Sequence, residues 1–358
     1  MNKLNNILVL CTGIAAIFCV SAVPGFGQNT RPPRPPVVWP KPVGHPPVAP
    51  VTAGGNSERS IKVDQGLNLK LCVTQGSVKI NGWNRNELRV FVQDGSNFGF
   101  KVLQTDPRTQ DPVWVSVVGI EGNSKFPSQT DCISGGEIEI DVPINSTVNF
   151  KGEETTTTID TLRKVDVKTS GGDISLRNVS GGVLAKTFEG NLTAEQCKGP
   201  MALDATAGNI VVFDAGPSEI GDIFSAKTTS GAISLQNLSY RQIDANSISG
   251  SVAFSGEILS GGTYNLTTSI GSIRMSIPQN SACTVSATYG YGRFNSDLPF
   301  KLETENLVEG NVKTVVGILG TGERNATLKL TTSNGSIGIR KLQTDTHPPK
   351  LHRITDLA

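Results

Sequence analysis

Apolar and polar residues alternate with a period of two between residues 61 and 150. The alternation recurs in short runs that are separated by glycines such as Gly76, Gly82 and Gly95. This pattern predicts β-strands that each bury one face. The runs are Ile61/Val63, Leu67/Leu69/Leu71, Val78/Ile80, Leu88/Val90/Val92, Val113/Val115/Val117 and Ile138/Ile140/Val142.

A repeated unit replaces this pattern beyond residue 151. Its clearest copies are residues 169–176, 229–235 and 333–339, which read TSGGDISL, TSGAISL and SNGSIGI. A period of about 20 residues, with two short strands and a glycine turn in each unit, predicts a β-solenoid. The glycines at 172, 190, 208, 231, 250, 271 and 292 are separated by 18, 18, 23, 19, 21 and 21 residues.

One such coil cannot be stable alone. Burying about four apolar side chains contributes roughly 1.5–3 kcal/mol each, whereas ordering about 20 residues costs about 1–2 kcal/mol apiece. Stacked coils join their apolar rows into one core and pair every strand. We therefore predict an all-β, single-chain parallel β-solenoid over residues 151–342, with residues 60–150 as an N-terminal β cap. The stretch 296–325 breaks the period and is expected to be a loop or an irregular coil, and residues 343–358 a flexible tail.

The first 27 residues have the features of a signal peptide. Lys3 precedes an apolar run over residues 7–20, and small residues follow. The run is shorter than the ~20 residues of a spanning helix, so cleavage is favoured over a retained anchor. Phe18 occupies the position where a lipid-modified Cys19 would need a small residue. We expect export to the periplasm, the cell surface or the medium, with at most a peripheral membrane association.

Residues 28–59 are predicted to be a disordered, proline-rich linker. Nine prolines fall between residues 32 and 50, which favours polyproline II. Arg31, Arg34 and Lys41 make the segment basic. It is either a tether that holds the folded region away from an anionic envelope surface or a solubilising leader.

Composition supports strands and argues against nucleic acid as a partner. Only 18% of the residues are charged, 39 are glycines, and the formal net charge is +1. Low charge and many turn-forming residues favour short strands over helices. A nucleic-acid-binding protein would be expected to carry a basic stripe.

Two motifs together resemble a known family. One is GSVKINGW at residues 76–83, followed by ELRV at 87–90, and the other is the recurring Thr-Ser-Gly-x-Ile-x-Leu unit. The ordered series is similar to the DUF4097 family of bacterial β-strand-repeat proteins, whose members are often labelled adhesins, and the resemblance covers residues 60–342. It implies a cell-envelope β-solenoid and supplies no catalytic residues. The long proline-rich leader departs from the family pattern.

The residue after each turn glycine would form a ladder along the stack. A calcium site or a pair of catalytic carboxylates needs several acids in this column, and it holds only one, Asp173. Histidine occurs only at positions 45, 347 and 352, outside the predicted framework. We therefore predict no catalytic residue, no metal site and no cofactor. The column comprises Asp173, Asn191, Asn209, Ala232, Ser251, Ser272, Arg293 and Ser336.

Four cysteines lie beyond the signal segment, and they allow three pairings. Cys197 and Cys283 are about four coils apart, on the order of 20 Å, which is too far for a disulfide. Both are expected to be small core residues. The plausible bridge joins Cys72 to Cys132 within the cap.

The only local group of aromatic residues is Tyr289, Tyr291, Phe294 and Phe300. Tyr289 and Tyr291 are possible platforms for stacking a sugar, although burial at a coil edge is the favoured interpretation.

Three functions remain open. The first is a non-catalytic, adhesin-like scaffold that binds an envelope or extracellular protein, glycan or wall polymer. The second is a carbohydrate-active β-helix enzyme or a lectin-like binder, which would need two or more acids and a Lys or Arg in one cleft. The third is an envelope-stress accessory protein that binds through an exposed strand edge.

Overall fold

The computed structural model describes residues 55–121, 128–308, 312–322 and 325–343, all within the compact unit Pro50–Ala358. Every regular element in these ranges is a β-strand, 26 in all. In the same ranges no helix has the length and hydropathy needed to cross a membrane. The predicted signal peptide, most of the linker and most of the tail lie outside the described residues.

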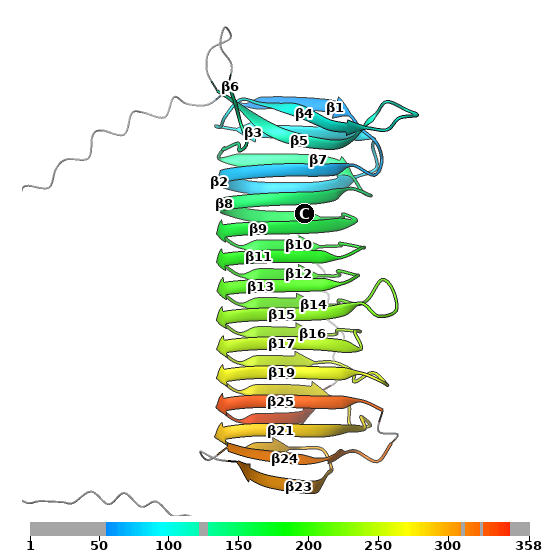
Figure 1. Cartoon of the computed structure of the whole chain (residues 1–358), viewed down its shortest axis with the longest axis vertical. Coiled ribbons are helices and arrows are strands. Elements are labelled where there is room, and N and C mark those ends of the chain that lie inside the picture. The colour runs from blue at the N-terminus through cyan, green and yellow to red at the C-terminus, as the bar shows by residue number, and fades with distance from the viewer. Residues whose placement is uncertain (1–54, 122–127, 309–311, 323–324, 344–358) are drawn as a thin grey trace, which may run out of the picture. The chain divides into compact units, whose positions relative to one another are not determined.

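The repeats form stacked coils, each with a longer and a shorter strand (Figure 1). Strands β9, β11, β13, β15, β17 and β19 pair in parallel and form the long-strand face. Strands β10, β12, β14, β16, β18 and β20 pair in parallel and form the short-strand face. The all-β solenoid prediction is therefore confirmed. The bounds are β9 Lys164–Gly171, β10 Ile174–Arg177, β11 Val183–Glu189, β12 Leu192–Glu195, β13 Met201–Ala207, β14 Ile210–Phe213, β15 Ile223–Ser230, β16 Ile233–Gln236, β17 Gln242–Ser249, β18 Val252–Ser255, β19 Thr263–Ile270 and β20 Ile273–Ile277.

The core fills the space between the two faces because alternate residues point inward. Val165, Val183 and Met201 are in register on neighbouring long strands and are all buried. Ile174 and Leu192 are the equivalent pair on the short-strand face. Each coil therefore adds to continuous apolar columns, which is how a unit too small to fold alone becomes part of a stable stack.

The turn glycines keep the coils in register. A Cβ added at Gly208 would overlap the carbonyl oxygen of Gly190, and one added at Gly231 would overlap that of Gly208. Any larger residue would force neighbouring coils apart at this corner. Gly208 and Gly231 are 23 residues apart in the sequence and still occupy equivalent corner positions. The longer spacing is taken up by the connection between β14 and β15, at residues 214–222.

The solenoid starts earlier than the sequence predicts. Strand β2 pairs in parallel with β8 from Asn68↔Thr147 to Asn81↔Asp160, and both strands pass around the corner, where Gly76 of β2 is in register with Thr155 of β8. They therefore form the first two coils, although residues 84–146 separate them in the chain. The predicted boundary at residue 150 falls within β8, and β1 begins three residues inside the predicted linker.

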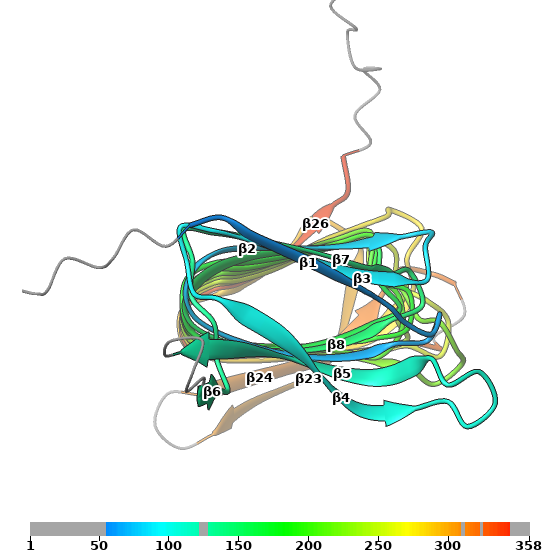
Figure 2. The same ribbon diagram turned by 90° about the horizontal axis from the view of Figure 1, so that it is seen from above.

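Antiparallel strands close this end of the stack (Figure 2). Strand β5 pairs in parallel with the first half of β2, and β7 pairs in parallel with its second half. The antiparallel pairs are β3 with β7, β1 with β3, and β4 with β5. The bounds are β1 Ser57–Lys62, β2 Asn68–Trp83, β3 Glu87–Gln93, β4 Phe98–Thr105, β5 Pro112–Glu121, β6 Ser128–Thr130, β7 Glu137–Pro143 and β8 Thr147–Asp160.

The last coil in the sequence is not the last coil in space. Strand β25 pairs with β19 on one side and β21 on the other, and β26 lies between β20 and β22. After β19 and β20, the chain therefore leaves one coil position empty and forms the following coil with β21 and β22. It then returns as β25 and β26, which occupy the empty position. The bounds are β21 Cys283–Tyr291, β22 Phe294–Ser296, β23 Phe300–Val308, β24 Val312–Leu319, β25 Thr327–Asn334 and β26 Ile337–Lys341.

The expectation of a loop or irregular coil over residues 296–325 is wrong. Strands β23 and β24 form an antiparallel hairpin there, and β24 pairs with β21. Val315 and Leu319 are buried, so the alternation typical of a strand is present. Antiparallel return strands need no turn glycine, and the hairpin therefore lacks the signature of the repeat.

Candidate functional site

The column after the turn glycines is a ladder of hydrogen bonds between coils. Asp173 Oδ1 accepts from the Asn191 backbone N–H at 2.8 Å and from Asn191 Nδ2 at 3.1 Å. Asn191 Oδ1 accepts from Asn209 in the same way, and Asn209 Oδ1 accepts from the Ala232 N–H at 2.8 Å. These oxygens join successive coils.

A second ladder lies beneath the same corner. Buried hydroxyls donate to the carbonyl of a glycine in the preceding coil: Thr268 Oγ1 to Gly250 at 2.7 Å and Ser247 Oγ to Gly231 at 2.8 Å. Sequence reasoning missed this column. Its signal is a threonine or serine three residues before the turn glycine, as Thr268 stands before Gly271. Because each buried hydroxyl has a partner, the column stabilises the corner.

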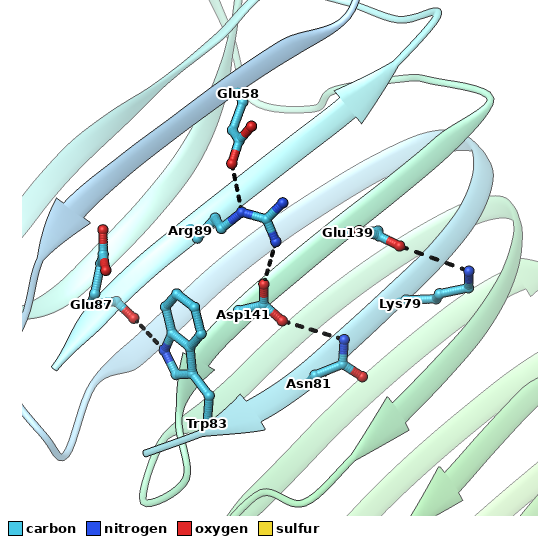
Figure 3. Close-up of polar contacts among 8 residues, drawn as sticks. All are labelled: Glu58, Lys79, Asn81, Trp83, Glu87, Arg89, Glu139 and Asp141. Carbon is cyan, nitrogen blue, oxygen red and sulfur yellow. Dashed lines mark hydrogen bonds and ion pairs between the residues drawn. The ribbon is translucent and has the colours of Figure 1, made fainter. Parts of the chain in front are cut away.

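Charged residues on the N-terminal part of the short-strand face form a network on the outer surface (Figure 3). Arg89 Nε donates to Glu58 Oε1 at 2.6 Å, and its Nη1 donates to Asp141 Oδ2 at 2.7 Å. These hydrogen bonds raise the pKa of Arg89 above its usual value. The network joins β1, β3 and β7 across the end of the stack.

The same surface carries two further polar contacts. Lys79 Nζ donates to Glu137 Oε1 at 2.5 Å, and this bond is the main reason that the Lys79 pKa is raised. Trp83 Nε1 donates to the Glu87 carbonyl at 2.8 Å, and the Arg85 guanidinium lies 5.0 Å from the Trp83 ring centroid. Exposed ion pairs of this kind each add little stability.

Along the central coils, some exposed cations have acidic partners on the next coil. Arg177 Nη2 lies 2.9 Å from Glu195 Oε2, and Lys186 Nζ lies 3.3 Å from Asp204 Oδ2. Each pair spans neighbouring strands of one face.

A hollow of about 200 Å³ lies at the C-terminal part of the short-strand face. Arg274 on β20 lies in register with Gly338 on β26, which lies in register with Asn295 on β22. Arg340 and Asp297 line the same hollow. Neither arginine has an acidic partner within 4.0 Å among the described residues.

The structure joins Cys72 and Cys132 in a disulfide, with Cα atoms 4.4 Å apart. Cys197 and Cys283 are buried free thiols. Burial raises the pKa of Cys283 to about 11 and also raises that of Cys197. Neither thiol is poised as a nucleophile, because thiolate formation is suppressed at neutral pH.

The two tyrosines considered as a stacking platform differ in exposure. Tyr289 is 8% exposed and packs in the core, whereas Tyr291 is 69% exposed at the end of β21. The aromatic contact in this region is instead between Phe294 and Phe300, with ring centroids 5.0 Å apart. The structure therefore does not offer Tyr289 as part of an accessible aromatic surface.

No group of three or more His, Cys, Asp or Glu side chains within the described ranges is arranged to hold a metal ion. The three histidines lie outside those ranges.

The geometry defines a parallel β-solenoid of two faces, cross-linked at its corners by side-chain ladders. The family model described as Toastrack DUF4097 matches residues 160–340, just over half of the chain. The chain belongs to this family. The matched region runs from the end of β8 to β26 and excludes the N-terminal strands that the sequence resemblance included.

Among solved structures, a putative cell adhesion protein from Clostridium sporogenes is 10% identical, with a TM-score of 0.24, over 80% of this chain and 99% of that chain. A putative adhesin from Parabacteroides merdae is also 10% identical, with a TM-score of 0.29, over 80% of this chain and 96% of that chain. A comparison with curated proteins finds no match.

Proposed function

We propose that the chain is a non-catalytic, exported protein of the cell envelope or surface that acts as an adhesin-like scaffold. In this proposal the solenoid presents a rigid surface to a protein, glycan or wall polymer. In the same proposal, the signal segment expected over residues 1–27 directs export, and the linker expected over residues 28–59 separates the solenoid from its point of attachment.

One observation carries the proposal. The residues after the turn glycines form the column in which a solenoid could repeat a reactive group. Side chains of this column, such as Asp173 and Asn191, instead make hydrogen bonds between coils. Outside the core, the C-terminal half of the long-strand face carries mainly hydroxyl and amide side chains. Two of its rows are Thr263–Thr327–Thr284 and Asn246–Thr267–Thr331–Thr288. Such a face suits recognition by hydrogen bonds across an extended area.

The arrangement favours binding over turnover of a carbohydrate. A β-helix enzyme acting through paired carboxylates needs two acids with a basic residue in one cleft. The hollow between β20 and β22 has two arginines but a single acid, Asp297, among its lining residues. This is a better match to a site that holds an anion.

The proposed accessory role through a strand edge receives less support. Strand β23 is the outer strand of the hairpin and pairs with β24 alone among the described strands. It carries the exposed charges Lys301, Glu303 and Glu305. Charged side chains on an edge strand oppose pairing with another chain.

The test is to incubate the purified exported chain with an array of glycans and with envelope polysaccharide, measuring binding and the release of reducing ends together. The proposal predicts saturable binding to an envelope component and no release above that of a heat-denatured sample. Release of reducing ends that increases with protein concentration would refute it.

A further inference from the structure

The hollow on the short-strand face is built by the return of the chain to form β26. Across the outer surface, one row runs Ala253–Arg274–Gly338–Asn295 and the next begins Ser255–Ser276–Arg340. The Asp297 N–H donates to the Ile339 carbonyl at 2.9 Å, which extends the second row beyond β22. Arg274 and Arg340 are therefore diagonal neighbours on adjacent strands, a spacing within reach of long side chains.

Gly338 creates the open space between these side chains. A Cβ added there would meet no atom within 4 Å, unlike the turn glycines, where it would overlap backbone. Glycine is unfavourable in a strand interior and often marks a place where a ligand approaches the backbone closely. Here no neighbouring segment among the described residues fills the space.

The charges around the hollow are unbalanced. Arg274, Arg340 and Lys341 are exposed, and Asp297 is the acid among the residues that line the hollow and its margin. Arg177 in an equivalent outward row is paired with Glu195 on the next coil. The arginines beside Gly338 thus keep their donors available for a group that is not part of the described chain.

We propose that this hollow binds an acidic glycan, with Arg274 and Arg340 holding an anionic group over Gly338. Planar guanidinium groups bind carboxylate and sulfate oxygens through paired hydrogen bonds. Ser255, Ser276 and Asn295 border the same surface and can hydrogen-bond to sugar hydroxyls. The inference rests on the proposed binding function and names its ligand class.

The test measures binding of the purified full chain to four immobilised probes: alginate, dextran sulfate, neutral dextran and poly-L-glutamate. We expect binding to alginate, dextran sulfate or both, and the stronger of the two identifies the anionic group. We expect weaker binding to neutral dextran and to poly-L-glutamate, which has carboxylates but no sugar hydroxyls. Equal binding to poly-L-glutamate would overturn the assignment to a glycan.

Three variants test the site itself. Arg274→Gln and Arg340→Gln should each weaken binding to the acidic glycan by about fivefold or more, because each removes a charged donor. Gly338→Val should weaken binding similarly by filling the hollow, while its thermal midpoint stays the same or rises. Arg177→Gln is the matched control, since it removes the same charge from an outward row and should leave binding within about twofold.

The outcomes separate this inference from the proposed function. If wild type binds acidic glycans but none of the three variants differs from Arg177→Gln, the site is wrong although the scaffold function stands. If wild type binds only other envelope components, the ligand class is wrong and the scaffold function again stands. Cleavage of a probe would instead contradict the scaffold function.

Discussion

Thr332 Oγ1 donates a hydrogen bond of 2.8 Å to the carbonyl of Gly271, which lies 61 residues earlier in the chain. The equivalent bond between coils adjacent in sequence, from Thr268 to Gly250, spans 18 residues. The corner ladder therefore extends from β19 to β25 across a change in the order of the chain. The coil that contains β25 and β26 therefore packs on the coil of β19 and β20 with the corner bond that joins coils adjacent in sequence.

The turn glycines should be intolerant of a side chain. Gly335→Ala should lower the free energy of unfolding by about 2–4 kcal/mol, because the added Cβ would overlap the Gly271 carbonyl oxygen. Gly338→Ala, three residues later, is the control and should leave the free energy of unfolding unchanged or raise it by up to about 1 kcal/mol, because the added Cβ meets no atom within 4 Å. Chemical denaturation of both variants measures the difference, and equal stabilities would show that the corner is not close-packed.

The disulfide between Cys72 and Cys132 should stabilise the N-terminal end of the stack. It closes a loop with a sequence separation of 60, for which the chain-entropy estimate is about 4 kcal/mol. The Cys72→Ala/Cys132→Ala variant should unfold at a lower denaturant concentration than wild type. Cys197→Ala, which removes a free cysteine, is the control for the loss of a thiol without the loss of a disulfide. Peptide mapping without reduction should find a 72–132 link, and a 197–283 link would contradict the register of the coils.

The solenoid should lose stability in alkaline solution. Burial raises the pKa of Cys283 to about 11 from a reference value of 9.0, and it also raises the pKa values of Cys197 and Tyr264. The unfolded chain loses these protons at a lower pH than the folded chain. The free energy of unfolding is therefore unaffected by these groups below about pH 9 and falls as the pH rises toward 11. Denaturation midpoints between pH 7 and 11 measure this. Cys283→Ala should show a shallower decline, and an identical slope would contradict the assignment.

The ladder after the turn glycines should act through hydrogen bonds and not through charge or metal. Asp173→Asn keeps an acceptor for the Asn191 N–H and should leave the thermal midpoint unchanged. Asn209→Ala removes the acceptor of the Ala232 N–H and should lower the free energy of unfolding by about 1 kcal/mol. Differential scanning calorimetry with calcium and with chelator should give the same midpoints. A shift with calcium that Asp173→Asn abolishes would instead indicate an ion site.

Much of the fold follows from local pattern alone. Apolar pairs such as Val165/Val167 and the glycine after each pair identify the coils, because both are required in every unit. The hydroxyl column is also visible, since residues such as Thr268 recur three positions before the glycine. The confirmed solenoid and the family both rest on these short-range signals.

The order of the coils and the arginine hollow could not be predicted in the same way. Every coil has nearly the same edges, so the repeat does not specify whether residues 327–341 follow 263–277 or 283–296 in space. The choice depends on the β23–β24 hairpin, which pairs antiparallel to β21 and prevents the last coil from adding beyond it. Arg274 and Arg340 come together only as a result of that choice.

The position of β25 between β19 and β21 completes the core and, with β26, creates the hollow. Thr331 lies in register with Thr267 on one side and Thr288 on the other. Oxidative cross-linking of paired cysteine variants in the full chain, carried out on a Cys197→Ala/Cys283→Ala background, tests it directly. Thr267→Cys with Thr331→Cys should cross-link, because paired strands are about 4.8 Å apart. Thr267→Cys with Thr288→Cys should not, because two strand spacings exceed the reach of a disulfide. Efficient cross-linking between positions 267 and 288 would contradict the position of β25 between β19 and β21.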